Sequence, residues 1–335
     1  MAQVLLLSAA SELGDPYNRG AFLKLLESAE RDLFKKHTLT DDPAAADVIL
    51  FAELYGAGPY FQAVRRHPFV RRFREKCFLF SSNDYVIPFL PGVYASIERR
   101  WKSPRTRSGF YLAVAENEFV EFTPPHDDLK YLYSFLGSVD NARVRSDILS
   151  LTHPRVFFQD TSADFREVMA GKRDLAAMQD YWRRYAEICK NSKFILCPRG
   201  KGVSSVRLFD SMRMGRVPVI LADQWVAPDG PRWHEFSLRI AEKDFRRTPD
   251  LLEQYESAAV KMGLLARKEW EKWFSPEVCF HHVVESCLDI KGKRKIPEKF
   301  ARFIPFIQYL RPLHFRHLLR TKYHAWQRRT QTTQR

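Results

Sequence analysis

Short apolar runs alternate with longer amphipathic stretches along most of the chain. In its first 80 residues, the apolar runs 4–8, 47–52 and 77–80 predict buried strands. Between them, residues 19–36 carry an apolar stripe with helical spacing, and residues 61–76 predict a second, more basic helix. Strands and helices in alternation are typical of a largely parallel sheet covered by helices.

The same alternation starts again in the second part of the chain. Residues 83–125 are rich in proline, glycine and aromatic residues, so we expect loops and a domain crossing there. The strands expected after them are 132–136, 156–159, 194–197 and 217–221, and the expected helices are 142–151, 174–190, 204–214, 249–274 and 276–288. The pattern predicts two α/β domains, 1–125 and 126–290, followed by a tail, 291–335.

The positive charge is concentrated in this tail. The chain has a formal charge of +14, and residues 291–335 contain thirteen Lys or Arg and a single acid, so they carry +12 of it. Aromatic and aliphatic residues are interleaved with these charges, a composition suited to an anionic membrane surface. A solvated helix that packs back on the domains fits the pattern equally well. Nucleic acid is not the expected partner, because the body of the chain is nearly neutral.

The cysteines and histidines predict neither a disulfide framework nor a metal site. Five cysteines are an odd number, no C-x-x-C pair occurs, and no histidines cluster at metal-ligand spacing along the chain. The first residues lack the basic and long apolar regions of a signal peptide, and no later run is long enough to span a membrane. We therefore expect buried thiols in a reducing compartment, the cytoplasm, with the tail as the candidate peripheral membrane contact.

Residues 192–228 are the most informative segment. Two fully apolar strands, 194–197 and 217–221, flank a helix that ends at Gly215, which makes one βαβ unit. Ligands of such sheets bind at the carboxyl ends of the strands, where the loop 198–202 precedes the free N–H groups of the helix. The loop lacks both the Walker A Lys-Ser/Thr and the third glycine of the dinucleotide fingerprint. It predicts an anion site that is not typical of an ATPase or a dehydrogenase.

Charged side chains surround the start of this helix. Arg199, Lys201 and Arg207 are placed to neutralise a diphosphate without a metal ion. Asp210, one turn into the helix, is placed to accept hydrogen bonds from ribose hydroxyls. The same residues are also compatible with a protein that binds no ligand here. Arg207 and Asp210 would then form a surface ion pair, and Arg199 would be a charge at the start of the helix. The pattern alone leaves the functional and the structural interpretation open.

This segment closely resembles the exostosin family, glycosyltransferase family 47. The family hallmark is aromatic-x-Leu-x-Pro-Arg-Gly, then Ser-x-Arg, then an acid three positions further, then a Pro-Val-Ile strand with a polar turn. The matching residues are Phe194, Leu196, Pro198, Arg199, Gly200, Ser205, Arg207, Asp210, 218–220 and 223–225. Asp210 departs from the usual Glu. The stretch 135–138, with Arg143 and Arg145 after it, resembles the family's Phe-x-Gly turn and helix. The resemblance reaches to about residue 288 and is weak before residue 131.

The resemblance implies a GT-B architecture, in which two Rossmann-like domains face each other across a cleft and the C-terminal one holds a nucleotide sugar. It implies an inverting transferase that moves a sugar, expected from a UDP-sugar, to a hydroxyl of a glycan or lipid-linked glycan, without a metal or other cofactor. The residues expected at the donor are Gly137, Arg143, Arg199, Gly200, Lys201, Ser205, Arg207 and Asp210.

Inversion requires a general base on the acceptor side of the cleft. Asp84 and Asp223 rank first, because each follows a predicted strand and Asp223 also belongs to the family pattern. Asp84 fits a turn cap as well, since an Asn-Asp pair at a strand end often has that role. Glu53, His126 and Asp127 are further carboxylates or bases near strand ends or the domain crossing.

Two other functions remain open from the sequence. One is a catalytically inactive module that binds a nucleotide sugar or serves as a scaffold of a glycan-synthesis complex. The other is a Rossmann enzyme outside glycan chemistry. Donor choice depends on a few pocket side chains in the loops, so the sequence does not identify the sugar, the nucleotide or the acceptor.

Overall fold

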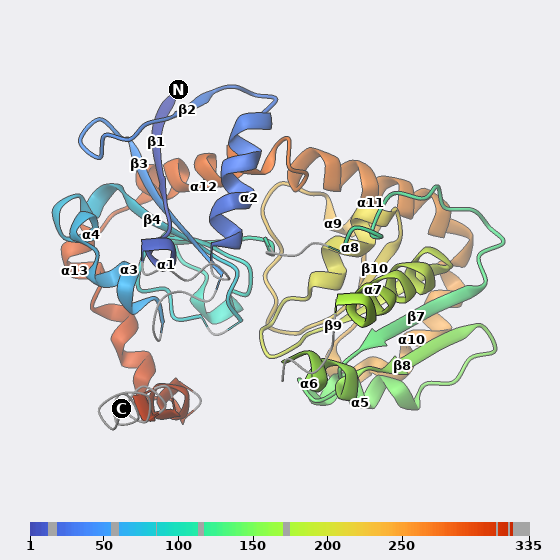
Figure 1. Ribbon diagram of the computed structural model, residues 1–335. Coiled ribbons are helices and arrows are strands. Elements are labelled where there is room, and N and C mark those ends of the chain that lie inside the picture. The colour runs from blue at the N-terminus through green and yellow to red at the C-terminus, as the bar shows by residue number, and fades with distance from the viewer. Residues whose placement is uncertain are drawn as a thin grey trace.

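The computed structural model forms two α/β domains side by side (Figure 1). It describes residues 1–12, 19–54, 60–84, 86–112, 117–169, 175–312, 314–320 and 322–323, so residues 324–335 of the predicted tail lie outside the described part. Each domain is built on a parallel sheet, and together they make up the GT-B architecture that the family resemblance implied. No helix in the described ranges has the length and hydrophobicity needed to cross a membrane.

The first sheet has the strand order β2-β1-β3-β4-β5-β6, with every neighbouring pair parallel. Its strands are β1 (Ala2–Leu7), β2 (His37–Leu39), β3 (Val48–Glu53), β4 (Cys77–Ser81), β5 (Gly92–Tyr94) and β6 (Thr106–Ser108). The central strands β3 and β4 are buried throughout, as their continuous apolar runs predict. The three-residue strands β2, β5 and β6 are too short to stand out in the sequence.

The helices of the first domain are α1 (Ala9–Glu12), α2 (Gly20–Arg31), α3 (Gln62–Arg66) and α4 (Pro68–Arg72). The single helix predicted at 61–76 is wrong, because the chain breaks between α3 and α4 and ends in a 3₁₀ turn at Arg74–Lys76. His67 caps α4 by accepting a hydrogen bond from the backbone N–H of Phe69, and Pro68 lacks the N–H that a continuous helix needs.

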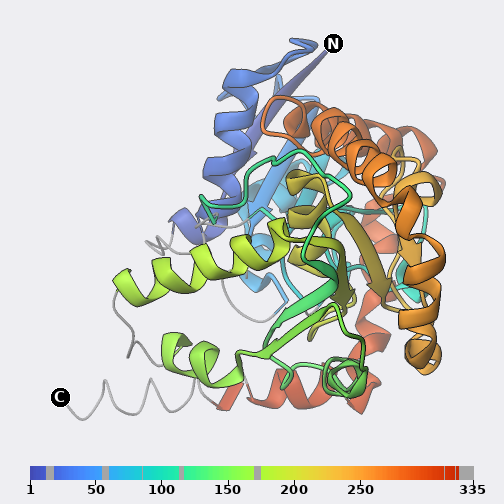
Figure 2. The same ribbon diagram turned by 90° about the vertical axis from the view of Figure 1, so that its right-hand side faces the viewer.

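The second sheet has the order β11-β10-β9-β7-β8. Its strands are β7 (Tyr131–Gly137), β8 (Val156–Asp160), β9 (Ser192–Pro198), β10 (Val217–Leu221) and β11 (Leu238–Arg239). The helices are α5 (Arg143–Asp147), α6 (Ser162–Met169), α7 (Leu175–Lys190), α8 (Val206–Met214), α9 (Trp233–Phe236), α10 (Thr248–Gln254) and α11 (Ala259–Trp273). Helices α7 and α8 cover one face of the sheet, and α5 and α10 cover the other (Figure 2).

Helix α12 (Cys279–Lys293) returns the chain to the first domain. It follows α11, which lies on the second domain, and packs against α2, β3 and β5 of the first (Figure 1). The boundary predicted at residue 290 is therefore wrong, because the chain leaves the second domain soon after α11. Helical periodicity shows that a helix has an apolar face but does not show which domain covers it.

The tail continues along the first domain as α13 (Glu298–Ala301) and a 3₁₀ segment (Ile304–Leu310). Glu298 is 2% exposed and accepts hydrogen bonds from Nε and Nη2 of Arg105 at 2.9 and 2.7 Å. Further along, the hydroxyl of Tyr60 lies 2.8 Å from Nδ1 of His314. These contacts make the inner face of the tail a brace on the first domain. All five cysteines are buried with free thiols.

The Glu298 ion pair provides a test of the brace. Glu298→Gln leaves the partly buried guanidinium of Arg105 without its carboxylate, so we expect the free energy of unfolding in urea to fall by about 3 kcal/mol. Glu30→Gln, on the exposed side of α2, is the matched control and should change it by less than about 0.5 kcal/mol. Equal unfolding curves for the two variants would show that the ion pair between Glu298 and Arg105 contributes no stability.

Candidate functional site

The strand order reverses at the carboxyl ends of β7 and β9. The chain passes from β7 outward to β8 and then crosses to β9 on the other side of β7, which leaves a crevice between their loops. Gly137 ends β7 and Pro198 ends β9, and the loop after β9 leads into α8. Topology therefore places the predicted ligand loop, 198–202, at the switch point of the second sheet.

Two buried serine hydroxyls lie at the start of α8. Ser204 and Ser205 are 4% and 6% exposed, and neither hydroxyl has a hydrogen-bond partner among the described residues. Ser205 is the N-cap residue, yet its side chain makes no capping bond. Buried hydroxyls rarely lack partners, and the first N–H groups of a helix attract anions. The start of α8 is thus equipped to bind an anionic group.

Arg145 ties the two loops of the crevice together. Its buried guanidinium donates to the carbonyl oxygens of Arg199 at 2.8 Å, Ser138 at 2.9 Å and Pro198 at 3.4 Å. Burial, with the nearby charge of Arg207, lowers the pKa of Arg145 to about 9, so the group stays protonated near neutral pH. The sequence placed Arg143 at the donor site. In the structure its side chain is 90% exposed and pairs with Asp147. The structure does not bring Arg143 to the crevice.

Arg207 lies against the end of β7. Its Nε and Nη2 donate to the carbonyl oxygen of Leu136 at 3.0 and 2.7 Å, and its guanidinium lies 4.9 Å from the centroid of the Phe135 ring. A Cβ on Gly137 would fall 1.8 Å from Nη2 of Arg207, so only glycine leaves room for this side chain. A Cβ on Gly200 would likewise meet Arg145, at 3.0 Å. The two predicted glycines therefore make space for arginines.

Arg199 has an acidic partner that the sequence did not reveal. Its Nε lies 3.0 Å from both carboxylate oxygens of Glu242. The same carboxylate accepts from the backbone N–H of Asp223, and Oδ1 of Asp223 accepts from the N–H of Glu242. Glu242 follows the short strand β11, where no motif marks it. Lys201, the remaining predicted cation, is exposed at the tip of the loop.

Asp210 opens onto a cavity of about 300 Å³ between the domains. Its Oδ2 accepts a hydrogen bond of 2.9 Å from the hydroxyl of Tyr185 on α7. Burial and the Asp210 carboxylate raise the pKa of Tyr185 well above its usual value, so this hydroxyl keeps its proton. Arg207 and Asp210 line the cavity from the second domain, while Tyr111 lines it on the opposite side.

Asp84 meets the ligand loop from the first domain. It follows β4 and accepts a hydrogen bond of 2.8 Å from the hydroxyl of Tyr111, while burial raises the pKa of its carboxyl group. A Cβ on Gly202 would lie 2.6 Å from Oδ1 of Asp84 and 2.1 Å from Oγ of Ser96. Ser96 accepts from the N–H of Val203 at 2.8 Å, so this loop closes directly on the first domain.

The other predicted carboxylates lie elsewhere. Asp223 is exposed and is engaged with Glu242, and no contact links it to the group around Asp84 in the described part of the chain. Glu53 is fully buried and accepts from the N–H of Ala9 at 2.6 Å and from the hydroxyl of Ser8 at 3.2 Å, so it caps α1. His126 and Asp127 lie in the connection before β7. Among the carboxylates predicted as the base, Asp84 is the one that the fold brings against the loop.

The second domain is similar to a known protein family. Residues 120–255 match the exostosin GT47 domain, and the match includes Gly137, Arg207 and Asp210. This part of the chain is therefore similar to an exostosin GT47 domain. Over 84 residues the chain is 36% identical to an exostosin-1 homolog of Caenorhabditis elegans, covering 24% of this chain and 22% of that protein.

Plant proteins are also similar to part of the chain. Over 99 residues the chain is 34% identical to the Arabidopsis thaliana protein named "Probable glucuronoxylan glucuronosyltransferase IRX7". The alignment covers 29% of this chain and 22% of that protein. The matches thus span less than a quarter of these two relatives. A solved glycosyltransferase of Rickettsia africae aligns with 86% of this chain and 98% of its own length, at 10% identity and a TM-score of 0.43.

The hydrogen bond between Tyr111 and Asp84 leads to a prediction for the pKa of the Asp84 carboxyl group. Tyr111→Phe removes a hydrogen bond that favours the carboxylate, so the pKa of Asp84 should rise further above its usual value. The carboxyl carbon shift of labelled aspartate, assigned with Asp84→Asn, reports this pKa by NMR. Tyr181→Phe, in the same cavity, is the control and should leave it unchanged. An unchanged pKa in Tyr111→Phe would contradict the contact.

Proposed function

We propose that this protein is an inverting glycosyltransferase that moves a sugar from a nucleotide sugar, expected to be a UDP-sugar, to a hydroxyl of a glycan acceptor. The reaction would belong to polysaccharide or glycoconjugate biosynthesis. The observation that carries the proposal is that the hydroxyls of Ser204 and Ser205, at the start of α8, have no hydrogen-bond partner in the described part of the chain. Both residues lie in the region similar to the GT47 domain. The relatives named as glycosyltransferases support the chemistry.

The diphosphate of the donor would bind at the start of α8. The free N–H groups of the helix and the two serine hydroxyls supply hydrogen bonds, and Arg207 supplies charge from the same helix. Asp210 then lies one turn further along the cavity, held by Tyr185, where a ribose would present its hydroxyls. Aspartate is one methylene shorter than the usual glutamate, and the Tyr185 contact fixes its direction.

Negative charge builds up on the leaving diphosphate as the sugar is transferred. Arg207 and the positive end of α8 are fixed before the reaction, so they stabilise this charge without reorganising. These groups provide what a metal ion supplies in other transferases, and we propose that transfer is metal-independent. Arg199 contributes to the same site if it exchanges its contact with Glu242 for the diphosphate.

Asp84 is the proposed general base. It stands on the first domain, opposite the start of α8, and Tyr111 fixes the carboxylate through its hydroxyl. Burial moves the pKa of Asp84 upward, toward the range in which a carboxylate accepts a proton effectively near neutral pH. Transfer should therefore be lost as the pH falls through this raised pKa, because the base becomes protonated. Asp223 is the second candidate.

The ion pair of Arg199 favours a second candidate function. Glu242 neutralises the family's hallmark arginine, which weakens the attraction of the site for a leaving diphosphate. A catalytically inactive module that binds a nucleotide sugar, or a scaffold of a glycan-synthesis complex, would tolerate this pairing. Transfer and donor binding, measured separately, distinguish the two functions.

We predict that Arg207→Met lowers sugar transfer at least about 100-fold, because it removes a fixed charge from the leaving group. Arg199→Ala should also abolish transfer. Arg143→Met, which removes an exposed arginine near the same crevice, is the matched control and should stay within about twofold of the unchanged chain. Release of nucleoside diphosphate from a panel of UDP- and GDP-sugars, measured in EDTA, reports transfer, and calorimetry with UDP reports binding.

Three outcomes would change the proposal. UDP binding without transfer from any donor would favour the inactive module. Equal activities of Arg207→Met and Arg143→Met would remove α8 from the donor site. Activity that disappears in EDTA and returns with manganese would show that transfer depends on a metal.

The outer face of the tail suits an anionic membrane. Phe303, Ile304, Ile307 and Leu310 are each more than half exposed, although they are apolar. Beside them is a cavity of about 310 Å³, lined by the basic side chains Arg65, Arg66, Arg71, Arg74 and Arg302. We propose that this face rests on anionic lipid, where a lipid-linked acceptor would be found. Apolar insertion and basic charge act together at such surfaces.

Vesicle sedimentation tests this face. The double variant Ile307→Ser and Leu310→Ser removes about 3 kcal/mol of apolar insertion, so partition onto phosphatidylserine vesicles should fall at least tenfold. Leu33→Ser, an exposed apolar residue outside the tail, is the control. Binding should weaken with salt, since the charges are screened over about 8 Å at physiological ionic strength. A chain that ignores anionic vesicles, or binds neutral ones equally, has a tail that serves as a brace alone.

A further inference from the structure

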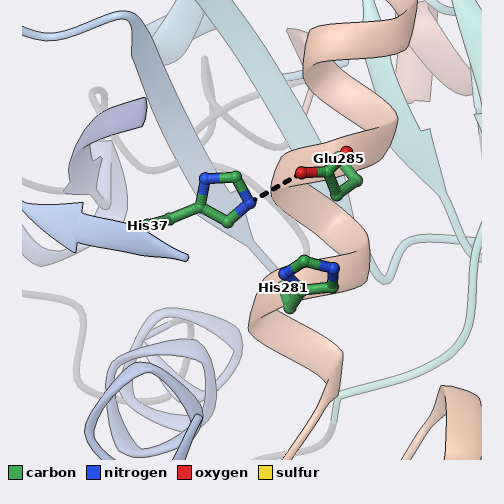
Figure 3. Close-up of side chains that lie close together, drawn as sticks. All are labelled: His37, His281 and Glu285. Carbon is green, nitrogen blue, oxygen red and sulfur yellow. Dashed lines mark ion pairs between the residues drawn. The ribbon is translucent and has the colours of Figure 1, made fainter. Parts of the chain in front are cut away.

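Three potential metal ligands meet where β2 lies against α12. His281 and Glu285 are four residues apart on α12 and therefore lie on the same face of the helix. His37 begins β2, the edge strand of the first sheet, and points toward them (Figure 3). One ligand atom from each residue lies within 4.8 Å of the other two.

The two imidazoles are buried without adequate partners. The side chain of His37 has no exposed surface, and its Nδ1 has no hydrogen-bond partner among the described residues. Its Nε2 pairs with Oε1 of Glu285 at 3.0 Å. His281 is 8% exposed, and its Nδ1 also lacks a partner. Buried polar groups without partners are uncommon, so these nitrogens point to a ligand.

The chemistry of the three donors selects the ligand. Two imidazoles and one carboxylate form a three-ligand set typical of zinc, which leaves a fourth position for water. Bonds of about 2.0–2.2 Å would place neighbouring ligand atoms about 3.4 Å apart, so small rotations of the rings are sufficient.

Lys36 is the competing cation. Its Nζ lies 2.8 Å from Oε1 of Glu285, but half of its side chain is exposed, so it can turn into solvent. Phe34 stacks on the ring of His281, with centroids 3.9 Å apart, and holds that ring in place. Phe34 therefore orients the ring of His281, whereas Lys36 can move away from Glu285 when a metal ion binds.

We propose that His37, His281 and Glu285 bind a zinc ion that fastens α12 to the edge strand of the first domain. The N-terminal end of α12 is already attached to α2, since the hydroxyl of Ser28 accepts from the N–H of Phe280 at 2.9 Å. Cys279, next to this contact, lines the cavity between the domains. The zinc ion would therefore hold one wall of the cleft, with a positioning role distinct from the transfer chemistry.

The experiment measures zinc directly on the full-length chain. Protein stripped with chelator is titrated with zinc chloride, and we expect one zinc per chain together with a higher thermal midpoint. His281→Phe keeps a ring against Phe34, and Glu285→Gln keeps the size of the side chain, yet each should weaken zinc binding at least about tenfold. His282→Gln, the adjacent histidine, which contacts the backbone of Lys272, is the matched control. Lys36→Gln should bind zinc as well as the unchanged chain or better.

Cobalt gives a second readout, because four-coordinate cobalt bound by nitrogen and oxygen absorbs visible light without the sulfur charge-transfer band that the buried thiols would produce. The proposal is overturned if His281→Phe and Glu285→Gln bind zinc like the unchanged chain, if zinc leaves the midpoint unaltered, or if the cobalt spectrum shows sulfur ligands. Neither readout requires sugar transfer, so the result is independent of the proposed enzymatic function.

Discussion

The guanidinium of Arg145 is the interaction on which the geometry of the site depends. It is buried at the switch point of the second sheet and bonds to carbonyl oxygens of the loops after β7 and β9. The three donor nitrogens of this rigid group thus hold together two loops that lie more than 50 residues apart in the sequence. The space for a second arginine, Arg207, then exists only because Gly137 has no side chain. A buried cation costs desolvation free energy, which these hydrogen bonds and the nearby carboxylate of Asp84 offset.

The two domains meet at a contact that combines packing with polar groups. Rings of Phe110, Phe209 and Phe274 lie with centroids 5.1–6.3 Å apart and join the first domain to α8 and the end of α11. Beside them, Gly202 approaches Asp84 and Ser96 so closely that a methyl group would not fit. The cleft is consequently narrow at the loop that would hold a diphosphate and wider toward α2 and α7, where a cavity remains. A base on one domain and an anion site on the other are brought together by this packing.

The last part of the chain connects these features to the outside of the molecule. Helix α12 carries the chain from the second domain back to the first, and the tail then follows the first domain with Glu298 buried against Arg105. One face of the tail is therefore structural, whereas its outer face keeps apolar and basic side chains in solvent. The same segment thus has both of the roles that its composition allowed, packing and an exposed basic surface, on opposite faces.

The sequence by itself determined the two parallel sheets, the helix α8 with its C-cap at Gly215, and the loop after β9, because continuous apolar strands, helical periodicity and a glycine turn are local signals. It also identified Asp84, Arg207 and Asp210 as candidates. Only the tertiary structure decided that Arg145 rather than Arg143 enters the crevice, that Glu242 pairs with Arg199, and that α12 belongs to the first domain. It alone brought His37 to His281 and Glu285, since these residues come from opposite ends of the chain. Such choices depend on which buried surfaces meet, and local patterns carry no information about partners distant in sequence.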